Sequence, residues 1–319
     1  MGIRANRLWA MSLPFCGMIG GSASATTPEA RAIAYLAREV PAWAAENRCH
    51  SCHNDGDGAR ALLDAIRRGR KVEASAVDET AGWLAKPEGW SKNGGDGPFS
   101  DKALAQVQFA STLAALVASG RSRARPALRR AADDLAKLQA ADGSWPVDDD
   151  AIGSPTTYGK ALATLSARDA LLAADPEAHA DRASKADAWF LRLDPTNTPD
   201  AAALAMAGAG RGGEMWADRR RVALAYLAKA QGPDGGWGPT AEAPTQAFDT
   251  ALGVLAVASS GDPAAIRDQV RRARACLVAT QEPDGGWPPT TRPAGGESYA
   301  QRVSTSAWAT LALLATAPK

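Results

Sequence analysis

One seven-residue pattern occurs three times in this chain and constrains its fold more than any other feature. The pattern Q-x-x-D-G-x-W covers residues 139–145, 231–237 and 281–287. The last two copies are 50 residues apart, and the first two are 92 apart, which leaves room for a degenerate copy between them. A sequence that repeats itself at this spacing is typical of an architecture in which each unit packs against the next.

The segments around each copy predict paired helices. Both neighbouring stretches are rich in Ala and Leu, which are strong helix formers. The stretch before the pattern carries charged side chains on one face, whereas the stretch after it is apolar over most of its length. We therefore expect a solvent-facing outer helix followed by a buried inner helix. The Asp-Gly turn should end the outer helix, with the Trp packed over that end and the Gln bonded to exposed helix-terminal groups.

These features predict an all-α fold, a ring of about five to six helical hairpins. We predict inner helices over residues 102–118, 158–172, 201–209, 248–258 and 304–314. We predict outer helices over residues 74–86, 125–139, 183–193, 217–231 and 264–281. One more hairpin at the N-terminus would pair an outer helix over 28–40, capped by Thr27, with an inner helix over 58–68.

The first 25 residues have the pattern of a secretory signal. Arg4 and Arg7 precede a short apolar stretch, and Ala23-Ser24-Ala25 has the small residues of a cleavage site. The apolar stretch is too short to span a bilayer, and no later apolar run is long enough for a transmembrane helix. We therefore expect a periplasmic or otherwise exported protein. A retained N-terminal anchor is the alternative.

A short motif after the first predicted helix points to a covalent cofactor. Cys49-His50-Ser51-Cys52-His53 contains C-x-x-C-H, whose two thiols can form thioethers to the vinyl groups of haem. His53 would then be the proximal iron ligand, and one haem c is the expected cofactor. A disulfide between Cys49 and Cys52 is one alternative, and a zinc site that uses both thiols and a histidine is another. Cys276 is expected to be a buried, inert thiol.

The sixth ligand of such a haem is left open by the sequence. His179, Met206 and Met215 are the protein candidates. His179 lies in a polar segment that predicts a surface histidine, and Met206 fits an apolar helix and therefore a core position. A five-coordinate or water-bound iron is the further possibility, and it would favour ligand binding or peroxide-type chemistry over simple electron transfer.

The three repeated segments resemble the QW motifs of the squalene–hopene cyclase and prenyltransferase superfamily. Gly143-Ser144-Trp145, Phe248-Asp249-Thr250-Ala251 and Ser304-Thr305-Ser306-Ala307-Trp308 are similar to loop and inner-helix segments of those proteins. The resemblance covers roughly residues 75–319 and implies an α/α-toroid. Hopene cyclases protonate an alkene with a D-x-D-D-T-A segment, which this sequence lacks. The nearest acidic cluster, residues 148–150, is expected to be a solvated or helix-capping turn.

Taken with the haem motif, the repeats predict three parts and one functional rim. The parts are a signal peptide at 1–25, a haem-attachment hairpin at 26–73 and a toroid domain at 74–319. Loops that lead from outer to inner helices should gather on one rim, with the haem among them. The rim candidates at the inner-helix starts are Tyr158, Phe248, Asp249, Tyr299, Arg302 and Thr305.

Four of these residues, Tyr158, Asp249, Tyr299 and Arg302, are candidates for catalysis. Arg292 or Arg302 could pair with haem propionates, and Tyr158 or Tyr299 could bond a distal ligand. The structural alternative is that these side chains cap helices and pair with Asp249 or Glu297. The sequence does not choose between these roles.

Three functions fit these observations. The first is an exported haem protein, with redox or haem-ligand chemistry at the rim and an apolar small molecule or redox partner. The second is a terpenoid-cyclase relative that acts on an isoprenoid. The third is a non-catalytic binding or scaffold protein. A formal net charge of +1 gives no reason to expect a nucleic-acid partner. The sequence leaves the enzyme status and the oligomeric state undetermined.

Overall fold

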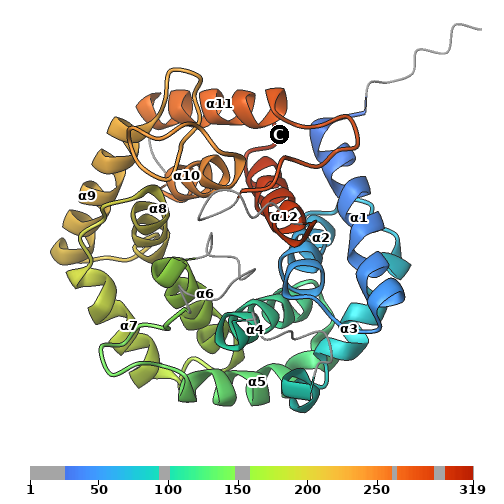
Figure 1. Ribbon diagram of the computed structural model, residues 1–319. Coiled ribbons are helices and arrows are strands. Elements are labelled where there is room, and N and C mark those ends of the chain that lie inside the picture. The colour runs from blue at the N-terminus through green and yellow to red at the C-terminus, as the bar shows by residue number, and fades with distance from the viewer. Residues whose placement is uncertain (1–25, 93–100, 148–158, 261–263, 291–298, 319) are drawn as a thin grey trace, which may run out of the picture.

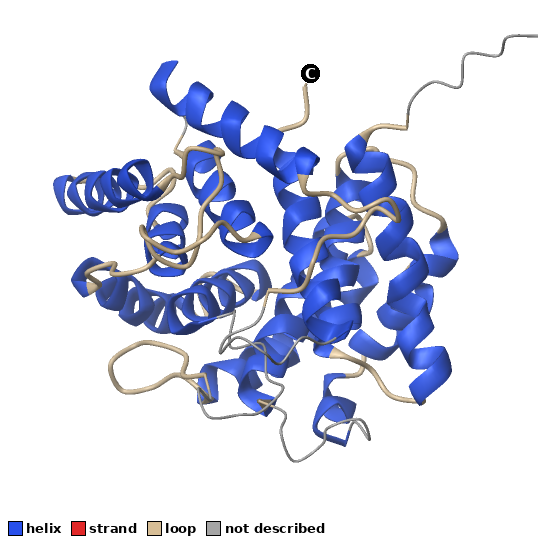
Figure 2. Cartoon of the chain, turned by 45° about the horizontal axis from the view of Figure 1, so that its top comes forward, coloured by secondary structure: helices blue, strands red, loops and turns tan. Residues whose placement is uncertain are grey.

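The computed structural model describes residues 26–92, 101–147, 159–260, 264–290 and 299–318. Throughout these ranges the regular structure is helical, and none of the described residues lies in a strand (Figure 2). The all-α fold predicted from the sequence is therefore confirmed. The predicted signal segment and the acidic cluster at 148–150 lie outside the described residues.

The described helices form two concentric layers (Figure 1). The outer layer consists of α1 (Pro28–Asn47), α3 (Asp78–Leu84), α5 (Arg125–Lys137), α7 (Ala180–Arg192), α9 (Glu214–Ala230) and α11 (Ala264–Ala279). The inner layer consists of α2 (Ala59–Arg67), α4 (Lys102–Ala118), α6 (Gly159–Ala174), α8 (Thr198–Ala207), α10 (Ala247–Ser259) and α12 (Tyr299–Ala315). Outer and inner helices alternate along the chain, which gives six hairpins among the described residues.

The N-terminal hairpin closes the ring. The inner helix α12 contacts α10 on one side and both α1 and α2 on the other, and α2 also contacts α4. The hairpin over residues 26–73 therefore packs between the last and the second hairpins and is part of the ring. The inner helices other than the amphipathic α2 are largely apolar because the outer layer and the neighbouring inner helices cover them.

Several helix boundaries differ from the sequence-based prediction, and two of these differences have a clear physical reason. Helix α1 was expected to end before Pro41, but it continues to Asn47. Packing of Ala44 into the interior and stacking of Trp43 on Tyr299 offset the cost of a proline inside the helix. Helix α3 is shorter than expected, because residues 74–76 form a separate 3₁₀ turn and Lys86 precedes a proline, which disfavours α-helix.

Each Gln of the repeated pattern joins two consecutive outer helices. Its side-chain amide donates to the carbonyl oxygen of the pattern's own glycine at 2.8–3.0 Å, in all three copies. The same amide also donates to a main-chain carbonyl of the next outer helix, at Arg182, Gln269 and Pro28 respectively. The Gln was expected to bond the exposed groups at the end of its own outer helix; it instead bonds carbonyls of the turn and of the neighbouring outer helix, and so links consecutive repeats.

The Trp of each pattern links the outer helix to the inner one. Its indole N–H donates to a leucine carbonyl ten residues earlier in the outer helix, at 2.8–2.9 Å. Its main-chain N–H donates to a hydroxyl on the following inner helix, from Thr164, Thr250 or Ser306. All three tryptophans are buried, as predicted for side chains that pack over a helix end.

The ring is closed by contacts between its first and last helices. Besides accepting the bond from Gln281, the start of α1 contributes Glu29, which forms a buried ion pair with Arg274 of α11. Gly285 has φ +96°, and a Cβ on it would collide with the main-chain carbonyl of Arg31 in α1. Only glycine fits both conditions, so the closing contact requires Gly285.

This closing contact can be tested with one methyl group. Gly285→Ala should lower the free energy of unfolding by roughly 1–3 kcal/mol, because it combines backbone strain with a collision across the seam. Gly82→Ala is the matched control, because no other atom lies near its Cβ position in α3; it should leave stability unchanged or raise it by up to about 1 kcal/mol. Urea unfolding followed by circular dichroism measures both, and equal effects would contradict the assigned role.

Candidate functional site

The cysteine motif occupies the turn between α1 and α2. Helix α1 ends at Arg48, whose φ of 56° places it in the left-handed region and turns the chain back toward the ring. Residues 52–58 then form a π-helical turn that leads directly into α2. This turn, named η1 here, contacts α12 and α4 as well as α1, and the motif lies between the outer and inner helices of the first hairpin, as predicted.

The three residues expected to hold haem are close to the protein interior. Cys49 is buried and its sulfur accepts a hydrogen bond from the Trp43 indole at 3.3 Å, while Cys52 is partly exposed. Neither thiol is in a disulfide. Burial lowers the pKa of His53 to about 4, so its imidazole is neutral at neutral pH, and its Nδ1 is buried with no hydrogen-bond partner in the described part of the chain.

His50, the second residue of the motif, is held by a buried carboxylate. Asp55 lies 3.1 Å from Nδ1 of His50 and accepts hydrogen bonds from the Ser51 main chain and the Thr80 hydroxyl. The His50 ring stacks on Trp83 with 4.3 Å between ring centroids. Trp83 in turn contacts Trp90 and Phe109. An aromatic cluster therefore packs beside the motif.

Tyr299 is the rim candidate that the structure brings to the motif. Its hydroxyl accepts a hydrogen bond from the Asn54 side chain at 3.0 Å and donates to Glu39 at 3.0 Å. Its ring stacks on Trp43, which itself bonds Cys49. Residues 245 positions apart in the sequence are thus adjacent here, which agrees with the prediction that the start of the last inner helix faces the motif.

The other rim candidates have structural partners. Arg302 pairs with Glu282 and Asp284 of the third repeated pattern and lies over the Tyr35 ring. Two carboxylates thus neutralise Arg302, which argues against the role proposed for it with haem propionates. Thr305 accepts a hydrogen bond from the main chain of Thr290. Asp249 and Phe248 are buried within α10. Tyr158 and Arg292 lie outside the described residues.

The candidate sixth ligands lie in different parts of the ring. His179 precedes α7 and is only 6 % exposed, 3.7 Å from Asp133. The expectation of a surface histidine was therefore wrong, because His179 packs between two outer helices. Met215 is 68 % exposed at the start of outer helix α9. Met206 faces the central cavity described below. Cys276 is buried as predicted, and burial raises its pKa to about 11.

A buried carboxyl group follows the motif in η1. Asp57 is 1 % exposed and accepts hydrogen bonds from Gln108 at 2.9 Å and from Ser304 at 2.6 Å. Arg60, one turn later, lies 3.5 Å from its other oxygen. Burial raises the pKa of Asp57 above its ordinary range, opposed by Arg60 and by these hydrogen bonds. This network joins η1 to α4 and α12.

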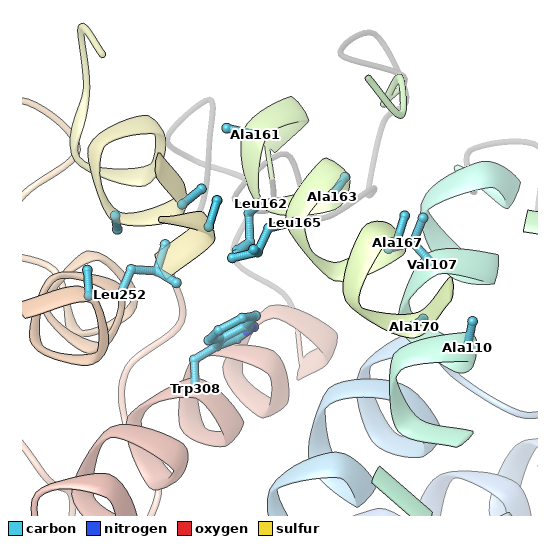
Figure 3. Packing of buried hydrophobic residues seen from close by; sticks show 14 of the residues in the cluster. Val107, Ala110, Ala161, Leu162, Ala163, Leu165, Ala167, Ala170, Leu252 and Trp308 are labelled. Carbon is cyan, nitrogen blue, oxygen red and sulfur yellow. The ribbon is translucent and has the colours of Figure 1, made fainter. Parts of the chain in front are cut away.

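The centre of the ring contains a cavity of about 390 Å³. Ala114, Leu162, Leu165, Met206 and Trp308 give it a largely apolar lining from α4, α6, α8 and α12. Figure 3 shows Trp308 pointing toward Leu162 and Leu165 across the space between α12 and α6. The volume falls in the range of small-molecule sites, and its lining suits an apolar molecule.

Two charged side chains, Arg60 and Asp169, interrupt this apolar lining. The Asp169 side chain is 58 % exposed although α6 is an inner helix, which means that it projects into the cavity. Burial nevertheless raises its pKa, against the effect of Arg168, which donates to it at 2.7 Å. Sequence reasoning missed Asp57, Arg60 and Asp169. The available signal for Asp169 was a charge in an inner helix predicted to be largely apolar.

The described residues contain neither a cluster of metal-binding side chains nor a helix that could span a membrane. No group of three or more His, Cys, Asp and Glu side chains in these ranges is arranged to hold a metal ion. Across the same ranges, no helix combines the length and apolar character needed to cross a membrane.

Comparisons with known proteins identify the fold. No family model matches the chain, and no curated protein matches it. The solved structure of the apo type II terpene cyclase MstE from Scytonema superposes with a TM-score of 0.58 at 14 % identity, covering 90 % of this chain and 96 % of that one. An arginine-to-alanine variant of MstE, in complex with its substrate geranylgeranyl dihydroxybenzoate, gives 0.56 at 14 % identity, covering 90 % and 98 %. The chain therefore has a terpenoid-cyclase-like toroid fold.

The buried carboxyl group in η1 predicts a specific pH dependence. Because the pKa of Asp57 is raised by folding, the wild type loses stability as pH rises from about 4 through the folded-state pKa. Asp57→Asn cannot ionise, so the unfolding free energy of the variant relative to the wild type should increase from about pH 4 to pH 7. Denaturant titrations across this range measure the difference in unfolding free energy. A decrease of this difference with rising pH would show that the attraction between Arg60 and the ionised carboxylate outweighs the effect of burial.

Proposed function

We propose that the cavity of the ring binds an isoprenoid and that the protein is a terpenoid-cyclase relative. The observation that carries this proposal is a largely apolar cavity of about 390 Å³, lined by the inner helices of a terpenoid-cyclase-like ring. The neighbouring structure binds a geranylgeranyl substrate within the same fold. Apolar side chains supply the affinity for such a ligand, and a few polar groups fix its orientation.

Asp169 is the proton donor in this proposal. Among the described residues that line the cavity it is the only acid, and its pKa is shifted upward, in the direction that a general acid requires. Its proton would pass to an alkene carbon of the isoprenoid, the resulting cation would close a ring, and loss of a proton elsewhere would restore the balance. The product would be an isomer of the substrate. This route does not use the D-x-D-D-T-A segment, which the sequence lacks.

Covalent haem at Cys49 and Cys52, with His53 as iron ligand, is the second candidate. Two thiols that form no disulfide lie beside a histidine whose imidazole is neutral and whose Nδ1 has no partner in the described part of the chain. A neutral imidazole and reduced thiols are the donor set that haem attachment needs, so these residues fit the group. When bound, haem would supply redox or ligand-binding chemistry. Attachment takes place outside the cytoplasm, so this candidate includes export.

The cyclase proposal predicts separate effects on binding and turnover. Ser166→Trp should fill the cavity and abolish binding of farnesol or geranylgeraniol, because Ser166 lies in its wall. Asp169→Asn should retain binding within about threefold but lose at least about 100-fold in the rate of isomer formation. Calorimetry measures the binding, and mass spectrometry detects a product of unchanged mass.

Asp218→Asn on the outside of α9 is the matched control for Asp169→Asn. It should behave as wild type in both measurements. Wild-type protein that binds neither alcohol would overturn the proposal. Binding with unchanged turnover in Asp169→Asn would remove this residue from the reaction.

The haem candidate predicts a change in mass. Co-expressed with a haem-maturation system and exported, the chain should gain one haem that survives denaturation, and Cys49→Ser with Cys52→Ser should remove it. Cys276→Ser is the matched control and should retain the haem, because this thiol lies in α11, outside the motif. An unmodified mass in folded, exported wild type would reject haem attachment.

A further inference from the structure

Arg60 presents a cation with few partners to the central cavity. Its side chain is 16 % exposed and lines the cavity from the first turn of α2. A guanidinium has five N–H donors. Within the described residues only Nη2 has an acceptor, Asp57 at a long 3.5 Å, and Nε is buried with none. A charged group that is mostly withdrawn from water normally has its donors paired.

The position of this guanidinium is fixed by two neighbours. Cζ of Arg60 lies 4.2 Å from the centre of the Trp308 ring. This cation–π contact holds the guanidinium against the cavity wall. Asp57 lies behind it, and the second oxygen of Asp57 is already engaged by Gln108 and Ser304. The raised pKa of Asp57 further limits how much of the cationic charge it offsets.

We propose that Arg60 binds the anionic head group of the ligand in the cavity, so that the ligand is an isoprenoid carboxylate. This inference rests on the proposed function, because it names the chemistry of the molecule held by the same cavity. The carboxylate would accept two hydrogen bonds from the planar guanidinium, and the hydrocarbon chain would lie along Leu162, Leu165 and Met206. A neutral isoprenoid would leave these donors unpaired.

The charges around the cavity favour a single negative charge on the ligand. Among the described residues that line it, Arg60 is the only cation, and Arg168 nearby is already paired with Asp187. A diphosphate would bring several negative charges into an apolar space where one guanidinium faces them and the carboxyl group of Asp169 shares the wall. The site therefore fits a carboxylate better than a diphosphate.

The test compares four probes that differ only at the head group: farnesoic acid, its methyl ester, farnesol and farnesyl diphosphate. Calorimetry with the full chain should show that the acid binds wild type at least about tenfold more tightly than the ester or the alcohol. Arg60→Gln should remove this preference and leave alcohol binding within about threefold. Arg221→Gln on the outside of α9 is the matched control and should keep the preference.

A third variant protects the test against misfolding. If Arg60→Gln does not fold, Arg60→Lys keeps the charge but loses the bidentate geometry, and it should reduce the preference for the acid over the ester. Equal binding of acid, ester and alcohol to wild type would overturn the role of Arg60. It would not affect the proposal that the cavity binds an isoprenoid. Tightest binding of the diphosphate would overturn the single-charge ligand. Binding of no probe would overturn both this inference and the proposed function.

Discussion

The close approach of each repeated Asp-Gly turn to the next outer helix is the interaction on which the rest of the ring depends. At Gly143, Gly235 and Gly285 the absence of a side chain lets the turn meet a main-chain carbonyl of the neighbouring helix. The Gln of the same pattern then bonds a second carbonyl of that helix. Main-chain atoms cannot vary with sequence, so this contact fixes the distance between hairpins and, through it, the width of the central cavity.

Much of the ring could be predicted because its repeats carry strong local signals. The inner helix over 102–118 was predicted at the bounds that the structure has, and the Thr27 cap is present, with its hydroxyl accepting from Ala30 at 3.2 Å. Prediction was poorest where tertiary contacts outweigh local preference. Helix α1 continues through Pro41 because residues beyond it pack inside the ring, and no local pattern encodes that packing.

The candidate site was only partly predictable for the same reason. The cysteine motif is a short local pattern, and the placement of Tyr299 beside it followed from the ring topology. Arg60 and Asp169 lie in inner helices that carry other charges as well, and a sequence does not show whether such a charge faces solvent, a partner or a cavity. The three-dimensional arrangement separates these cases, because Arg168 is buried against Asp187 while its neighbour Asp169 lines the cavity.

The seam between the first and last hairpins also imposes an order on the assembly of the molecule. Pro28 and its partner Gln281 are separated by 253 positions, so the ring cannot close until nearly the whole chain has been synthesised. Cys49 and His53 belong to the first hairpin and are buried in the closed ring. Any large group must therefore be attached to them before the ring closes, or after the first and last hairpins have separated. Ring closure thus limits the time during which the N-terminal hairpin is open to chemical modification.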